Sequence, residues 1–186
     1  MKVSALILIL ALAIAGGSVA VATDSPAIWI DVPYVKQAKE GCGSAAIAMV
    51  MQYWAKQAGR GADAAEADPA KIQELLHSRG HRGITASAME EYFRKQNYQT
   101  YAFRGDWNDL ETHIAKGRPL IVCLKASGDL GPMHYAVVVG IDKARDYVFL
   151  NDPAMGKMLR ISREGFQSEW DLAKNWTLMA VPAGSR

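Results

Sequence analysis

Residues 41–57 of this 186-residue chain read GCGSAAIAMVMQYWAKQ. From Gly43 to Gln52 the stretch is apolar on nearly every helical face, which predicts a helix buried in the core rather than an amphipathic surface helix. Cys42 stands between two glycines directly at the expected start of this helix. Glycines allow a sharp backbone turn and the close approach of a bound group. Cys42 is therefore a candidate functional residue.

The position of Cys42 favours a reactive thiolate. A thiol at the N-terminal end of a helix lies near the positive end of the helix dipole, which lowers its pKa. The unpaired backbone N–H groups of a helix start can also hold an oxyanion. Gln37, five residues upstream, can add a side-chain amide donor to the same oxyanion hole. The segment thus predicts a cysteine nucleophile with an adjoining oxyanion site.

A thiolate nucleophile needs a proton carrier, and histidine is the usual one. His134 begins the apolar run HYAVVVGID, and Asp152 ends the next run, DYVFLND. A hairpin brings both residues to one end of a sheet, where Asp152 can orient the His134 ring. The other histidines read as ordinary surface residues: His77, His81 and His113. From the residues alone, His134 can equally be a hydrogen-bonded sheet histidine and Asp152 a turn residue.

The remaining pattern predicts an α+β domain, with helices first and a sheet afterwards. We expect a short strand at 28–35, a helix capped by Asp68 and ended by Gly80, and a strand near 99–103. A further helix starts at Thr85 or Ser87, where Ser87 and Glu90 fit a capping box. Another helix is expected at 106–116, and Ser162 caps a helix that runs to 170. The predicted antiparallel strands are LIVCLKA, HYAVVVGID, DYVFLND, KMLRIS and WTLMAV.

The N-terminus predicts export. Lys2 precedes the unbroken apolar run at 5–15, and Ala20-Val-Ala22 offers a small-residue cleavage site, so residues 1–22 read as a signal peptide. Cleavage after Ala20 and a retained membrane anchor are the alternatives. Residues 23–186 then form one domain, periplasmic or secreted. Disulfides persist in such compartments, so a disulfide between Cys42 and Cys123 is an alternative. Cys123 lies in an apolar strand, however, where a free cysteine packs well.

The charge balance bears on partners and cofactors. With 21 Lys and Arg against 19 Asp and Glu, the net charge of +2 gives no attraction to nucleic acid or to an anionic membrane surface. His77 and His81 are four residues apart, but Gly80 breaks the helix between them and no third ligand is evident. We therefore expect no metal and no cofactor. The expected partner is a protein or peptide substrate, and the expected state is a monomer.

Taken in order, these motifs resemble the C39-type cysteine peptidases, a branch of the papain-like fold. The matching segments are 32–34, Gln37, 41–43, 45–53, 83–85, 133–140, 151–153, Phe166 and Trp170. The resemblance implies Cys42 as nucleophile, His134 as base, Asp152 as its orienting partner and Gln37 as oxyanion donor. It also implies a helical half that carries Cys42 and an antiparallel sheet that carries His134.

The same resemblance bears on the substrate. Transporter-attached members cut leader peptides after Gly-Gly on the cytosolic side, whereas this chain has a predicted signal peptide. The spacing from Gln37 to Cys42 is also one residue shorter than in many of those members. We expect an exported cysteine endopeptidase with Gly-Gly-like cleavage sites. A Cys-His-Asp acyltransferase or amidase and a catalytically silent peptide-binding chaperone of a secretion system are the alternatives.

Overall fold

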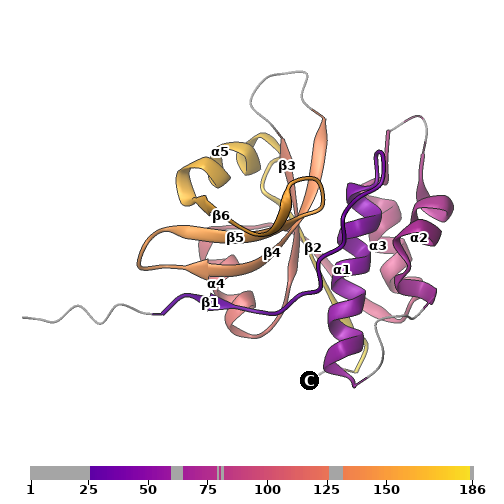
Figure 1. The fold of residues 1–186 in the computed structure, drawn as a ribbon, viewed down its shortest axis with the longest axis horizontal. Coiled ribbons are helices and arrows are strands. Elements are labelled where there is room, and N and C mark those ends of the chain that lie inside the picture. Colours follow the sequence, from indigo (N-terminus) through magenta and orange to yellow (C-terminus); the bar gives the residue numbers. More distant parts are fainter. Residues whose placement is uncertain (1–25, 60–64, 79, 81, 126–131, 185–186) are drawn as a thin grey trace, which may run out of the picture.

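The computed structural model describes residues 26–59, 65–78, 80, 82–125 and 132–184. The predicted signal peptide at 1–22 and His81 lie outside these residues. The architecture is α+β, as expected (Figure 1). Its elements in chain order are β1 (Ile28–Trp29), α1 (Cys42–Gln57), η1 (Ala65–Ala67), α2 (Pro69–Leu76), α3 (Ala86–Lys95), β2 (Tyr98–Arg104), α4 (Trp107–Ala115), β3 (Leu120–Lys125), β4 (Met133–Asp142), β5 (Tyr147–Asp152), β6 (Gly156–Ser162), α5 (Arg163–Leu172) and β7 (Trp176–Pro182).

The strands form one antiparallel sheet in the order β2-β7-β3-β4-β5-β6, and β1 pairs with β4 beside this path. Pairing between consecutive strands holds from β3 to β6, as the sequence predicts. The last strand, β7, lies instead between β2 and β3. With β7 inserted there, the β3–β4 pair lies in the middle of the sheet. Strand β4 carries His134.

Helices cover both faces of the sheet. Figure 1 shows α1, α2 and α3 on one side and α5 on the other. In β3, Ile121 and Cys123 pack in the core with α1, whereas Val122 and Leu124 pack in the core with α4 and α5. A strand covered on both faces is apolar at successive positions instead of alternating. Helix α1 is likewise buried on nearly every face up to Met51, which confirms the prediction.

Three local boundaries differ from the sequence prediction. Helix α2 starts at the Asp68 cap but ends at Leu76 rather than Gly80, because His77 leaves the helical conformation and Ser78 pairs with Gly83. The cap of α3 is Thr85, whose side chain accepts from the Ala88 N–H. The predicted capping box at Ser87 is wrong, because α3 starts at Ala86 and Ser87 therefore lies inside the helix. The Ser87 hydroxyl lies 3.2 Å from the Thr85 hydroxyl. Strand β1 spans two residues, fewer than predicted.

The start of α1, the start of β4 and the turn from β5 to β6 lie at the same end of the molecule (Figure 1). The backbone holds this arrangement, because the Gln37 N–H donates to the Pro153 carbonyl over 3.0 Å. Among the helices that the structure describes, none is long and apolar enough to cross a membrane. The fold thus gathers the chain segments that carry the predicted site residues.

Candidate active site

Cys42 is the first residue of α1, with Gly41 as its N-cap. The flanking glycines are required by packing. A Cβ at position 43 would lie 2.9 Å from the Ile84 Cβ, and one at 41 would lie 3.1 Å from the Ala38 backbone. Contacts at the first of these distances are essentially absent from real side chains. The Gly-Cys-Gly motif therefore lets the loop and α1 pack closely around the thiol.

A tight turn delivers the chain to Cys42. The Gly41 N–H donates to the Ala38 carbonyl over 3.1 Å, and Glu40 has a φ of +55° within this turn. Left-handed backbone is unfavourable for a residue with a Cβ, so surrounding contacts must hold it. The Glu40 carboxylate lies 3.7 Å from His77 and 3.6 Å from Arg82, and its carbonyl accepts from Gln73. The sequence gives no signal for this role of Glu40.

His134 and Asp152 meet as the sequence predicts. The His134 Nε2 lies 2.9 Å from the Asp152 Oδ1. The same oxygen accepts from the backbone N–H groups of Ala154 at 2.8 Å and Met155 at 3.1 Å. Because Nε2 is bonded to Asp152, Nδ1 is the ring atom left for the hydrogen bond that joins His134 to the Cys42 thiol. The carboxylate thus fixes the tautomer and the orientation of the ring.

The surroundings of Cys42 favour its charged form. Burial alone raises the pKa of the thiol, but hydrogen bonds from His134 and from the Tyr135 backbone, together with the His134 charge, lower it further than burial raises it. The net pKa of Cys42 is therefore below its usual value. A thiolate at this position is the nucleophilic form of the residue.

The partner ring is held in the protonated form. Burial lowers the pKa of His134, but hydrogen bonds with Asp152 and Cys42 and their negative charges raise it to about 9. The pKa of the Asp152 carboxyl is lowered overall, because the His134 contact and the two backbone donors outweigh the effect of burial. Both shifts favour a thiolate–imidazolium pair with a carboxylate behind it.

Gln37 lies in the segment that leads to Cys42. Its backbone N–H is bonded to Pro153, one residue after Asp152, and its Oε1 is buried without a hydrogen-bond partner in the described part of the chain. Gln37 also lines a cavity of about 370 Å³ together with Ala38, Ser44 and residues of α2. The structure therefore places Gln37 beside the nucleophile loop, next to the turn that carries Asp152.

The second cysteine is separate from this charged group. Cys42 and Cys123 are both free. Cys123 lies on β3 opposite Tyr135, and its sulfur is 3.7 Å from the Met133 sulfur. Burial and the nearby Cys42 charge raise the pKa of Cys123 to about 11, so this thiol stays protonated near neutral pH. The disulfide alternative is thus not the arrangement in the structure.

The other histidines serve local contacts. His77 pairs with Gln73 and Glu40, and His113 packs against Phe103. Across the residues that the structure describes, no group of three or more potential metal-ligating side chains is present.

Several backbone and amide contacts at the site carry weak or no signals in the sequence. Asn151 is fully buried, and its side chain donates to the Val32 carbonyl and accepts from the Met158 N–H. The Pro153 carbonyl accepts from the Tyr34 hydroxyl as well as from Gln37. A polar residue inside an apolar run was the available clue to Asn151. These bonds hold the end of β5 against the segment before α1.

The family follows from a match over most of the chain. Residues 29–177 match the model of the Peptidase_C39 like family. The chain belongs to this C39-like peptidase family. The matched range includes Gln37, Cys42, His134 and Asp152, and the resemblance predicted from the sequence is confirmed. No curated protein is significantly similar to this C39-like chain.

Solved structures agree with this assignment. The peptidase domain of Streptococcus ComA, a bi-functional ABC transporter involved in a quorum-sensing pathway, is 27% identical with a TM-score of 0.62, over 82% of this C39-like chain and 99% of that domain. A double glycine motif protease from an AMS/PCAT transporter, solved in complex with the leader peptide, is 21% identical with a TM-score of 0.61. The match covers 83% of this chain and 94% of that protease. A putative C39-like peptidase from Bacillus anthracis is 15% identical with a TM-score of 0.61, over 87% and 100%. The papain-like α+β fold predicted from the sequence is confirmed.

Proposed function

We propose that this chain is a cysteine endopeptidase in which Cys42 attacks the carbonyl carbon of a peptide bond. The attack forms a tetrahedral oxyanion, which the backbone N–H groups at the start of α1 and the Gln37 side-chain amide stabilise. His134 then gives its proton to the leaving nitrogen, the C–N bond breaks, and a thioester to Cys42 remains. Water attacks the thioester with His134 as base, which releases the acid and restores the thiol.

The observation that carries this proposal is the chain of contacts from Cys42 through His134 to Asp152. The hydrogen bond from Nε2 to Asp152 leaves Nδ1 toward the thiol, and the pKa of Cys42 is lowered while that of His134 is raised to about 9. A structural cysteine has no need of a buried imidazolium beside it. A silent peptide-binding domain likewise has no need of this charged group, which supports turnover rather than binding alone.

The family suggests the substrate. One structural relative is named as a double glycine motif protease and was solved with a leader peptide. We therefore propose a protein or peptide substrate that is cut after a pair of small residues such as Gly-Gly.

Product analysis tests the proposal against its two rivals. A peptide with a central Gly-Gly is incubated with the protein and with the Cys42→Ala variant, with and without an added amine, and the products are identified by mass spectrometry. A peptidase gives two fragments with a new α-amino group, and Cys42→Ala gives none. Amine-linked fragments would indicate an acyltransferase, and binding without turnover would indicate a chaperone. Cys123→Ala is the matched control and should cleave like the unaltered protein.

We also propose that the enzyme acts outside the cytosol after removal of residues 1–22. The support is the charge and hydropathy pattern of the N-terminus, with one lysine before a long apolar run. N-terminal sequencing of the protein from its native cell is the test. A mature chain that begins at Thr23 agrees with the proposal, a start at Val21 moves the cleavage site, and an intact Met1 contradicts it.

A further inference from the structure

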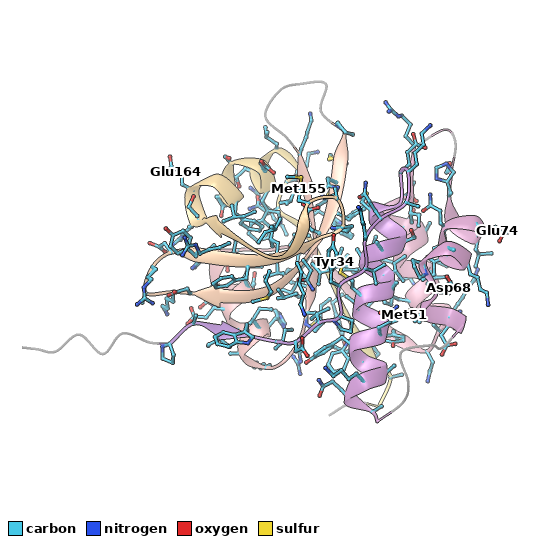
Figure 2. The ribbon with its side chains drawn as sticks, viewed as in Figure 1. Tyr34, Met51, Asp68, Glu74, Met155 and Glu164 are labelled. Carbon is cyan, nitrogen blue, oxygen red and sulfur yellow. The ribbon has the colours of Figure 1, made fainter. Side chains whose placement is uncertain are left out.

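Two exposed methionines flank the catalytic histidine and aspartate. Met133 is 56% exposed and directly precedes His134, and Met155 is 76% exposed in the turn after Asp152. Figure 2 shows Met155 at the turn between β5 and β6. Large apolar side chains left in solvent beside an active site are typical of a surface that binds another molecule. Methionine is flexible and polarisable, so such a surface accommodates side chains of different shapes.

One hydrogen bond fixes the backbone of Met155 at Asp152, and another fixes the side chain of Met133 at Cys123. The Met155 N–H donates to the Asp152 Oδ1, which is the same oxygen that His134 Nε2 contacts. The Met133 sulfur lies 3.7 Å from the buried Cys123 sulfur, while more than half of the residue is exposed. Neither side chain takes part in the proton transfer steps.

The direction of the proposed reaction decides which part of a substrate reaches them. The acyl part bonds to Cys42, and its carbonyl oxygen lies at the start of α1 beside Gln37. His134 must approach the leaving nitrogen within hydrogen-bond distance to protonate it. The residue that carries this nitrogen therefore lies beside His134. Met133 precedes His134 on β4, and Met155 is bonded through its backbone to Asp152, the partner of His134.

We infer that Met133 and Met155 bind the residue that follows the scissile bond, and that the enzyme prefers large apolar residues at this position. The inference rests on the proposed peptidase function. A residue such as Leu covers methionine surface that Ser leaves in water, and this contact favours the Leu substrate by about tenfold in kcat/KM. The cross-strand neighbour of Met133 is Lys125, so a basic residue is disfavoured by charge.

The test uses two peptides that share Gly-Gly and differ only in having Leu or Ser after it. Their kcat/KM ratio is measured for the unaltered protein, for the Met133→Ser, Met155→Ser double variant, and for Leu172→Ser. Leu172 is 48% exposed at the end of α5 and serves as the matched control. We expect a ratio of about ten for the unaltered protein and the control, and less than about three for the double variant.

A binding measurement separates this inference from the proposed chemistry. The Kd values of the same two peptides are measured on Cys42→Ala, with and without the two methionine substitutions, so that no cleavage is needed. If the Cys42→Ala protein binds the Leu peptide more tightly and the methionine substitutions remove this preference, the result supports binding by Met133 and Met155. This holds even if the unaltered protein cuts neither peptide. Cleavage with equal kcat/KM for Leu and Ser, or a preference that survives both substitutions, would overturn the inference and leave the peptidase proposal intact. No cleavage and no preferential binding would overturn both.

Discussion

We predict that the negative charge of Asp152 sets the pH range over which the site is active. The substitution Asp152→Asn tests this effect of the charge alone. The Asp152 Oδ1 accepts from His134, Ala154 and Met155. An asparagine oxygen can accept the same three bonds, so the substitution removes the negative charge while keeping the turn and the ring orientation. Asp152→Ala removes both the charge and the acceptor and serves as the comparison.

The structure gives the direction of the effect. Burial lowers the pKa of His134, and the hydrogen bond with Asp152, the hydrogen bond with Cys42 and the charge of Asp152 follow in that order among the contributions that raise it to about 9. Loss of the charge therefore lowers that pKa, and we predict a shift of about one unit, which corresponds to ~1.4 kcal/mol. Protonated His134 is needed to give a proton to the leaving amine, so activity falls as pH rises through this pKa. The alkaline limb should move from about pH 9 to about pH 8 or below.

The assay is kcat/KM for a Gly-Gly peptide from about pH 5 to about pH 10. We expect Asp152→Asn to retain a tenth or more of the maximum activity with the shifted limb. Asp152→Ala should lose about 100-fold because the ring is no longer oriented. An alkaline limb that stays in place in Asp152→Asn would refute the reasoning, because it would show that the carboxylate charge does not control the His134 proton.

Three further substitutions test other parts of the site. Gln37→Ala removes the proposed side-chain oxyanion donor and should lower kcat by about 10- to 100-fold with little change in KM, as steady-state kinetics would show. An unchanged kcat would remove Gln37 from the mechanism. Gly43→Ala places a Cβ 2.9 Å from the Ile84 Cβ and should lower the free energy of unfolding by about 1–3 kcal/mol in urea titrations. Equal stability would mean that α1 shifts freely. Cys123→Ala should cost about 1 kcal/mol of stability and leave cleavage within about twofold, whereas lost cleavage would assign Cys123 a part in catalysis.

Much of this fold is readable from the sequence because its signals are local. Asp68 caps α2 and Ser162 caps α5, each at the position expected from residue type. The helix expected at 106–116 is α4, with Asp106 as its cap. The apolar runs gave the strands from β3 to β6 in their true order of pairing. Thr85 and Ser87 illustrate the limit, because both residue types suit a cap, and only the folded backbone, which is extended at Thr85 and helical at Ser87, decides between them.

Other features depend on contacts between distant segments and leave no local trace. The place of β7 between β2 and β3 follows from packing on both faces of the sheet rather than from its own residues. The Tyr135 N–H that bonds the Cys42 thiol is a backbone group, for which any residue type would serve. The left-handed Glu40 is held by His77 and Arg82, which lie far along the chain. Residue types therefore indicated Cys42, His134 and Asp152, but not the Tyr135 backbone group or the Glu40 contacts around them.

Differential alkylation of the two cysteines tests directly whether Cys42 is a thiolate paired with His134. The native protein is treated with iodoacetamide at about pH 6, where an ordinary thiol is protonated, and the modified residues are located by mass spectrometry. A Cys42 thiolate paired with His134 predicts rapid modification of Cys42 and none of Cys123, whose pKa is about 11. Faster modification of Cys123, or two unmodified cysteines joined in a disulfide, would contradict the assignment of Cys42 as the reactive thiolate.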